Sequence, residues 1–244
     1  MSNYLLILEY DGAGFHGWQK QPDCRSVQTE LEKAAKKALR CTVKVIGAAR
    51  TDAGVHASGQ AANIISDKQF EPYKLVDALN SLLPKDISVV SAKKVPEDFN
   101  ARFDAKEKTY TYRIWNRRVR SVWAQKSSWH IPTPLDMKKL KRSAKNLIGR
   151  HDYTAFAASG GMQENKTLKL RQIDIVEKDG LILLRYTADR FLYHMIRLVT
   201  GALVEAGRGR IKPEKIKEAL MNGKRDFLLT TAPARGLTLE RVRF

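Results

Sequence analysis

The order of strands and helices along the chain is the feature that most restricts its fold. In the first half, apolar runs and helical stripes predict a strand, a helix, two strands, a helix and a strand, over residues 4–10, 26–39, 42–48, 60–66, 72–84 and 87–92. This is the split βαβ order of a ferredoxin-like unit, whose helices cover one face of an antiparallel sheet. The sequence therefore predicts such a unit over residues 1–104.

The second half repeats this order. Strands are predicted over residues 109–115, 170–176, 181–186 and 237–244, and helices over 136–148, 191–206 and 213–222. The repeat lies in the order of the elements and not in the residues themselves. We therefore expect an α+β fold of two tandem ferredoxin-like, or RRM-like, units, 1–104 and 105–244. Their mainly antiparallel sheets are expected to join, with helices on one face and an active-site cleft between the units.

Charge separates the two halves. Residues 1–104 hold 14 Lys and Arg against 13 Asp and Glu, whereas residues 105–244 hold 30 against 13. A field this basic attracts polyanions and gains affinity from the release of phosphate counterions. Nucleic acid is therefore the expected partner class, with a basic but inert surface as the alternative. Neither a signal-peptide pattern nor a membrane-length apolar run is found, so we expect a cytoplasmic protein without membrane contact.

The sequence indicates neither a metal nor a cofactor. Cys24 and Cys41 lie outside any CxxC or Cys/His cluster. Gly12, Gly14 and Gly17 have the GxGxxG spacing of a dinucleotide-binding loop directly after a strand. Residues 18–22, Trp-Gln-Lys-Gln-Pro, follow where that loop requires the N-terminus of a helix. A dinucleotide site is therefore rejected.

Residues 47–60 form the loop that is the first candidate for a functional site. It holds Arg50 and Asp52, with glycines at 47, 54 and 59, between two apolar runs that are typical of buried strands. The loop is either a site or an ordinary connection, because Asp and Gly are common turn residues. Two other loops, the basic residues 116–120 and the polar residues 157–167, are either phosphate contacts or solvated segments.

Motifs along nearly the whole chain resemble those of the TruA family of bacterial tRNA pseudouridine synthases. They are 10–12 (Tyr-Asp-Gly), Phe15, 17–19 (Gly-Trp-Gln), Gln21, 50–52 (Arg-Thr-Asp), 54–57 (Gly-Val-His-Ala), 59–60 (Gly-Gln), Asn80, 83–84 (Leu-Pro), 86–87 (Asp-Ile), 99–103 (Phe-Asn-Ala-Arg-Phe), Tyr110, Tyr112, Gly149, 151–152 (His-Asp), 191–193 (Phe-Leu-Tyr), Met195, Arg197, 232–233 (Ala-Pro) and 236–237 (Gly-Leu). Two positions depart from the family pattern: Ala49 replaces a usual Gly and Asn100 a usual His.

The resemblance implies isomerisation of uridine to pseudouridine at positions 38 to 40, in the anticodon arm of tRNA. It implies that Asp52 is the catalytic aspartate, as nucleophile or as base, and that Arg50 positions the extruded nucleotide. Tyr110 then stacks on the target base, Arg197 pairs with the catalytic carboxylate, and Leu237 lines the uracil pocket. The implied reaction requires no cofactor or metal, because it transfers no electrons, and family members are homodimers in which one tRNA contacts both subunits.

Physical chemistry supports part of this assignment. The isomerisation transfers no electrons, so it needs no redox group. Arg197 lies on a helix that is otherwise apolar nearby, and a buried guanidinium requires an acidic partner. His16, His56 and His194 are assigned no chemistry, because each is equally well explained as a structural histidine. The competing hypothesis is a non-catalytic RNA-binding protein with RRM-like units, which the missing aromatic RNP1 pattern disfavours.

Overall fold

The computed structural model describes residues 1–161, 163–227 and 230–244. The chain divides into two compact units, one made of residues 1–106 and 238–244 and the other of residues 107–237. The last strand, which the repeat of element order assigned to the second half, therefore belongs with the first unit over residues 238–244. Each unit is described by itself below.

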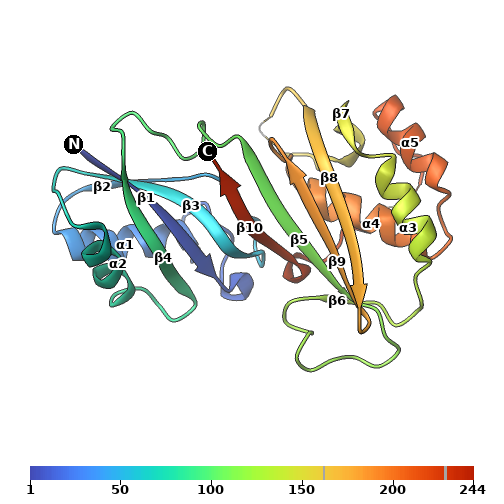
Figure 1. Cartoon of the computed structure of the whole chain (residues 1–244), viewed down its shortest axis with the longest axis horizontal. Coiled ribbons are helices and arrows are strands. Elements are labelled where there is room, and N and C mark those ends of the chain that lie inside the picture. The colour runs from blue at the N-terminus through green and yellow to red at the C-terminus, as the bar shows by residue number, and fades with distance from the viewer. Residues whose placement is uncertain (162, 228–229) are drawn as a thin grey trace. The chain divides into compact units, whose positions relative to one another are not determined.

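The first unit has the strand, helix, strand, strand, helix, strand order expected from the sequence. Its elements are β1 (Ser2–Tyr10), the short 3-10 helix η1 (Gly12–Gly14), α1 (Val27–Leu39), β2 (Val43–Gly47), β3 (His56–Ser66), α2 (Pro72–Asn80) and β4 (Ile87–Val95), with β10 (Leu237–Arg243) supplied by the end of the chain. Both helices contact each other and lie against the sheet, α1 on β2 and α2 on β4 (Figure 1).

The strand order β4-β1-β3-β2 is that of a ferredoxin-like sheet, with every neighbouring pair antiparallel. β10 adds a short parallel pairing to β3, where Thr238 and Leu239 face His56 and Ala57. Because β1 and β10 both pair with the start of β3, that strand begins at His56 rather than at residue 60. The loop predicted over 47–60 is shortened accordingly, to the residues between β2 and β3.

The helix ends of the first unit follow local chemistry. Ser26 caps α1 with a side chain that accepts the Thr29 N–H, and Arg40 ends it in the left-handed conformation. Pro72 opens α2. The Asn80 amide at the end of α2 donates to Val89 O (2.9 Å) and accepts from Val89 N (2.8 Å), which fixes α2 to β4.

The second unit is also a mixed α and β structure. It contains β5 (Glu107–Trp115), β6 (Trp129–His130), α3 (Met137–Lys145), β7 (Gly149–Asp152), η2 (Thr154–Phe156), β8 (Thr167–Lys178), β9 (Leu181–Ala188), α4 (Met195–Gly207), α5 (Pro213–Asn222) and η3 (Ala234–Gly236). β5, β9, β8 and β7 are antiparallel neighbours in that order, and β6 pairs parallel to β5. The predicted α+β class and mainly antiparallel pairing are confirmed, whereas a cleft between the units stays a prediction.

Two helix boundaries of the second unit differ from expectation. α4 begins at Met195 instead of residue 191, because His194 has a φ of +57°, which a right-handed helix does not allow. α3 ends at Lys145 instead of residue 148, where Asn146 turns its side-chain amide to Pro213 O (2.9 Å) at the start of α5. In the part of the chain that the structure describes, no helix is long and apolar enough to cross a membrane.

Candidate active site

The loop between β2 and β3 is held by the buried residue that separates Arg50 from Asp52. Thr51 shares a 2.7 Å hydrogen bond between its Oγ1 and the Tyr10 hydroxyl, and its carbonyl accepts the Trp18 N–H at 3.0 Å. Thr51 is buried, whereas Arg50 is exposed and Asp52 is half-buried. Anchoring the central residue inward therefore presents the guanidinium and the carboxylate on either side of it toward the surface.

A glutamine clamps the same loop one residue earlier. The Gln60 side chain of β3 donates to Ala49 O (2.9 Å) and accepts from Ala49 N (3.3 Å), so both backbone groups of Ala49 are satisfied. Ala49 does not have a positive φ, so a methyl group is accommodated where the family usually has glycine. This departure from the family pattern leaves the loop backbone intact.

The glycines that follow β1 pack against the Asp52 loop. A Cβ at Gly12 would overlap Val55 O, and Gly17, at φ +88°, would place a Cβ 2.5 Å from Thr51 O. Gly54 N also donates to Phe15 O (3.2 Å). Glycine is therefore required at positions 12 and 17 by two loops in close contact.

Tyr10 and His56 are structural groups of this loop. Burial raises the pKa of the Tyr10 hydroxyl above its ordinary value, although hydrogen bonds with Thr51 and Gln60 oppose the shift. Tyr10 is therefore a neutral anchor at physiological pH. His56 Nδ1 lies 3.1 Å from Gly12 N and accepts that N–H, which fixes the ring between η1 and the start of β3.

Asn100, the other departure from the family pattern, begins a turn in the same unit. Its side-chain oxygen accepts the backbone N–H groups of Arg102 (3.0 Å) and Phe103 (3.3 Å). The next residue, Ala101, donates its N–H to the buried Asn63 side chain at 2.9 Å. Asn100 therefore stabilises the segment through local hydrogen bonds.

In the second unit, Tyr110 lies on β5 with only 7% of its surface exposed. Its ring meets Phe191 edge to face, with the ring centroids 5.2 Å apart. Phe191 belongs to the non-helical segment that leads into α4. Tyr110 is therefore fixed between the sheet and the entrance to that helix.

Arg197 is half-buried on the first turn of α4 and bonds to the segment that precedes Leu237. Its Nε donates to Ala232 O (2.8 Å), while Ala232 N donates to Arg197 O (3.1 Å). The Tyr112 hydroxyl donates to Pro233 O (2.8 Å), which ties β5 to the same segment. Leu237 follows directly and is 5% exposed. These bonds join the three elements that carry Tyr110, Arg197 and Leu237.

Two sets of predicted residues are thus assembled, each in its own unit. Arg50 and Asp52 share one anchored loop of the first unit, and Tyr110, Arg197 and Leu237 lie on connected elements of the second. The carboxylate partner expected for Arg197 stays a prediction, as does the convergence of the two sets on one substrate. Sequence reasoning assigned no role to Tyr10, Thr51 or Gln60, although polar residues inside apolar strand patterns are a signal of buried hydrogen bonding.

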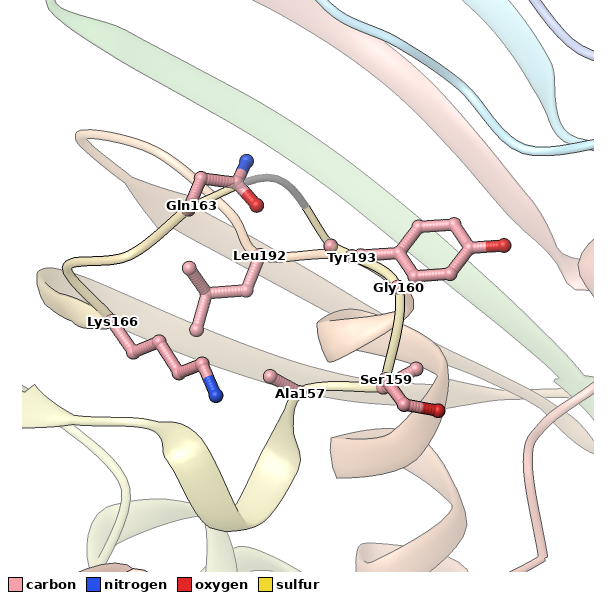
Figure 2. A pocket seen from close by; sticks show the side chains of 9 residues that line it. Ala157, Ser159, Gly160, Gln163, Lys166, Leu192 and Tyr193 are labelled. Carbon is pink, nitrogen blue, oxygen red and sulfur yellow. The ribbon is translucent and has the colours of Figure 1, made fainter.

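The polar loop predicted over residues 157–167 lines a pocket together with the segment before α4. The lining residues are Ala157, Ala158, Ser159, Gly160, Gly161, Gln163, Lys166, Leu192 and Tyr193. Figure 2 shows the ring of Tyr193 directed away from Lys166. Met162 of the predicted loop lies outside the described residues. Phosphate contact by this loop stays a prediction.

Comparison with known proteins gives full-length matches. The tRNA pseudouridine synthase A of Thermoanaerobacter sp. (strain X514) is 40% identical over 242 residues, 99% of each chain. That of Listeria monocytogenes serovar 1/2a is 40% identical over 247 residues, covering both chains completely. Among solved structures, a chain of the crystal structure of the archaeal box H/ACA sRNP Nop10-Cbf5 complex has a TM-score of 0.37 at 16% identity, over 96% of this chain and 48% of that one.

A family model makes the relationship explicit. The model described as tRNA pseudouridine synthase matches residues 6–104 and 143–244, which include every candidate site residue except Tyr110. The matched ranges cover the Asp52 loop of the first unit and the Arg197 helix of the second. Together with relatives of equal length at 40% identity, this match shows that the chain belongs to the tRNA pseudouridine synthase family.

Proposed function

We propose that this protein isomerises uridine to pseudouridine at positions 38 to 40 in the anticodon arm of tRNA, with Asp52 as the catalytic group. The observation that carries the proposal is the anchored Thr51, which presents Asp52 on a rigid loop beside Arg50. A catalytic group held in fixed geometry lowers the entropic cost of reaching the transition state. Family membership supports isomerase chemistry over the alternative of a non-catalytic RNA-binding protein.

The reaction conserves every atom of the nucleotide except one exchanged hydrogen. The N1–C1′ bond of uridine breaks, the uracil turns, and C5 bonds to C1′; the C5 proton leaves to solvent and N1 takes up a proton. Asp52 supplies the carboxylate that attacks or deprotonates the nucleotide. Tyr110 stacks on the uracil and assists proton removal at C5, and Leu237 forms an apolar wall of the pocket.

The two arginines have different parts in the proposal. Arg50, exposed beside Asp52, holds the extruded nucleotide and the RNA around it, which offsets the cost of leaving the base stack. Arg197 pairs with the catalytic carboxylate. Its hydrogen bond to Ala232 O ties the guanidinium to the segment that precedes Leu237.

In this proposal the two units supply different residues of the site. The first, residues 1–104 in the predicted division, carries the Asp52 loop. The second, residues 105–244, contributes Tyr110, Arg197 and most of the basic surface that binds RNA. We extend the proposal to a homodimer in which one tRNA contacts both subunits, which sedimentation of the protein with and without tRNA tests. Because its substrate is tRNA, the proposed location is the cytoplasm.

Tritium release from tRNA labelled at uracil C5 tests the catalytic assignment. Asp52→Asn should bind tRNA with unchanged affinity and release no tritium. Asp67→Asn, which alters an exposed carboxylate of the same unit, is the matched control and should react at the wild-type rate. Normal release by Asp52→Asn would refute the role of Asp52. Mapping the modified positions then shows whether they are 38 to 40.

A further inference from the structure

The loop between β5 and β6 carries an exposed apolar cluster that the catalytic proposal does not use. Val119, Val122 and Trp123 are 66%, 61% and 91% exposed. A tryptophan normally loses most of its surface on folding, since a large aromatic side chain gains more from burial than almost any other. At 91% exposure Trp123 contributes little to the stability of the free protein, so a binding partner that covers it is expected.

The loop that carries the exposed Trp123 is held in place by hydrogen bonds. Trp115 Nε1 donates to Val119 O (2.9 Å), and Ser128 Oγ donates to Ala124 O (2.6 Å). Arg235 Nε donates to Ser128 O (3.2 Å), which ties the end of the loop to the segment before β10. The indole is therefore displayed on a backbone that hydrogen bonds already hold in place, so that binding would order few additional residues.

Charge around the tryptophan identifies the chemistry of its partner. Between Glu107 and Asp136 the sequence contains six Lys and Arg and no Asp or Glu. Arg118, Arg120 and Lys126 are all exposed. A second copy of this surface would bring like charges together, which opposes association. A nucleic acid offers both phosphates for the cations and flat bases for the indole.

We propose that the loop of residues 116–128 is an RNA contact in which Trp123 stacks on an unpaired base of the tRNA, while Arg118 and Arg120 bind neighbouring phosphates. The inference rests on the proposed function, because it takes tRNA as the substrate. It adds a binding surface on the second unit that is separate from the uracil-contacting residues. Stacking on an aromatic side chain is tolerant of base identity, so this contact contributes affinity rather than a choice of sequence.

Binding of unmodified tRNA to three purified variants tests the proposal. Trp123→Ala should weaken the affinity about tenfold, in line with the loss of one stacked base. Trp123→Phe, which keeps a flat ring, should stay within about threefold of wild type. Tyr73→Ala removes an exposed aromatic ring, 62% accessible, from α2 of the first unit and should leave the affinity unchanged. Thermal melting should be unaltered in all three, because these rings are mainly exposed.

Salt dependence separates the phosphate contacts from the stacking. Arg118→Ala and Arg120→Ala should each reduce the slope of log affinity against log salt concentration by about one, whereas Trp123→Ala should leave the slope unchanged. At saturating tRNA, the rate of tritium release by Trp123→Ala should equal that of wild type. This pattern distinguishes a binding contact from a catalytic one.

Wild-type tRNA affinity for Trp123→Ala would overturn the inference. If the sedimentation coefficient of the free variant also changed, the cluster would be assigned to a contact between proteins. Because equilibrium binding requires no turnover, a failure of the Asp52 assignment would appear only in tritium release and is distinguishable from a failure here.

Discussion

The hydrogen bond between Tyr10 and Thr51 provides a quantitative test of how the catalytic loop is held. Tyr10→Phe removes the hydroxyl and leaves Thr51 Oγ1, its 2.7 Å partner, buried without it. An orphaned buried polar group costs about 1–3 kcal/mol, and we expect about 1.5 kcal/mol for this pair. For a chain of this size, that loss lowers the melting temperature by roughly 3–6 °C.

A double-variant cycle isolates the bond from other effects of each substitution. Thr51→Val removes the other hydroxyl and should cost a similar amount, because Tyr10 then keeps only its 3.4 Å contact with the Gln60 amide. In Tyr10→Phe/Thr51→Val, both hydroxyls of the pair are gone, so neither is left buried without the other. The double variant should therefore lose no more than about 2 kcal/mol, less than the sum of about 3 kcal/mol for the single variants.

Urea unfolding of the four proteins and single-turnover tritium release are the assays. Because Thr51 adjoins Asp52, we expect Tyr10→Phe to slow the chemical step about tenfold at saturating tRNA while tRNA affinity is kept. Additive costs in the cycle would show that the hydroxyls do not interact. An unaltered rate in a clearly destabilised Tyr10→Phe would show that the anchor supports the fold without positioning Asp52.

Three further outcomes are expected. Gly17→Ala should destabilise the protein by more than about 1 kcal/mol and reduce tritium release, because the new Cβ is strained at φ +88° and lies 2.5 Å from Thr51 O; wild-type melting would contradict this. Burial raises the pKa of Tyr10, so the unfolded chain loses that proton first and stability should fall above about pH 10; urea titrations of Tyr10→Phe should show a slope shallower by up to about 1.4 kcal/mol per pH unit. The hydrogen bond and charge of Arg25 lower the pKa of Asp86, so the stability this pair adds should be lost as acid protonates Asp86, and Arg25→Met should flatten the acid limb of the stability curve.

Element order was predictable in the first unit because its signals are local. Ser26, Pro72 and the apolar stripes between them act within one or two turns of helix, so they can be identified without knowledge of the fold. The start of β3 was not predictable in the same way. The start of β3 is determined by its pairing with β1 and with β10, which lies at the far end of the chain. No local sequence pattern indicates such a pairing.

The predicted start of α4 was wrong for a related reason. Phe191 and Leu192 continue the apolar pattern of the helix, so periodicity alone extends α4 over them. The φ of +57° at His194 ends the regular backbone there, and histidine gives no sequence signal for it as a glycine would. The rings of Tyr193 and His194 stack, with their centroids 3.9 Å apart, and no sequence pattern indicates this contact either.

Among the candidate residues, Asp52 and Arg50 could be suspected from the loop composition, whereas Tyr110 and Leu237 required the family resemblance. A tyrosine within a strand and a leucine at the start of one are ordinary core residues by every local criterion, and both are in fact buried. The proposed roles of Tyr110 and Leu237 depend on the elements that surround them in the fold. The bonds from Arg197 to Ala232 and from Tyr112 to Pro233 give those elements fixed positions within the second unit.

In the loop around Asp52, Thr51 has no catalytic role of its own but helps to position Arg50 and Asp52. Thr51 is buried between the exposed Arg50 and the half-buried Asp52. Tyr10 and Trp18 bind Thr51 by its side chain and its carbonyl, which leaves little freedom to rotate the loop. A substitution at Thr51 should therefore lower the reaction rate without changing any group that contacts RNA. Arg50→Ala should do the opposite and weaken tRNA binding while the loop and its stability are preserved, because the Arg50 side chain is exposed.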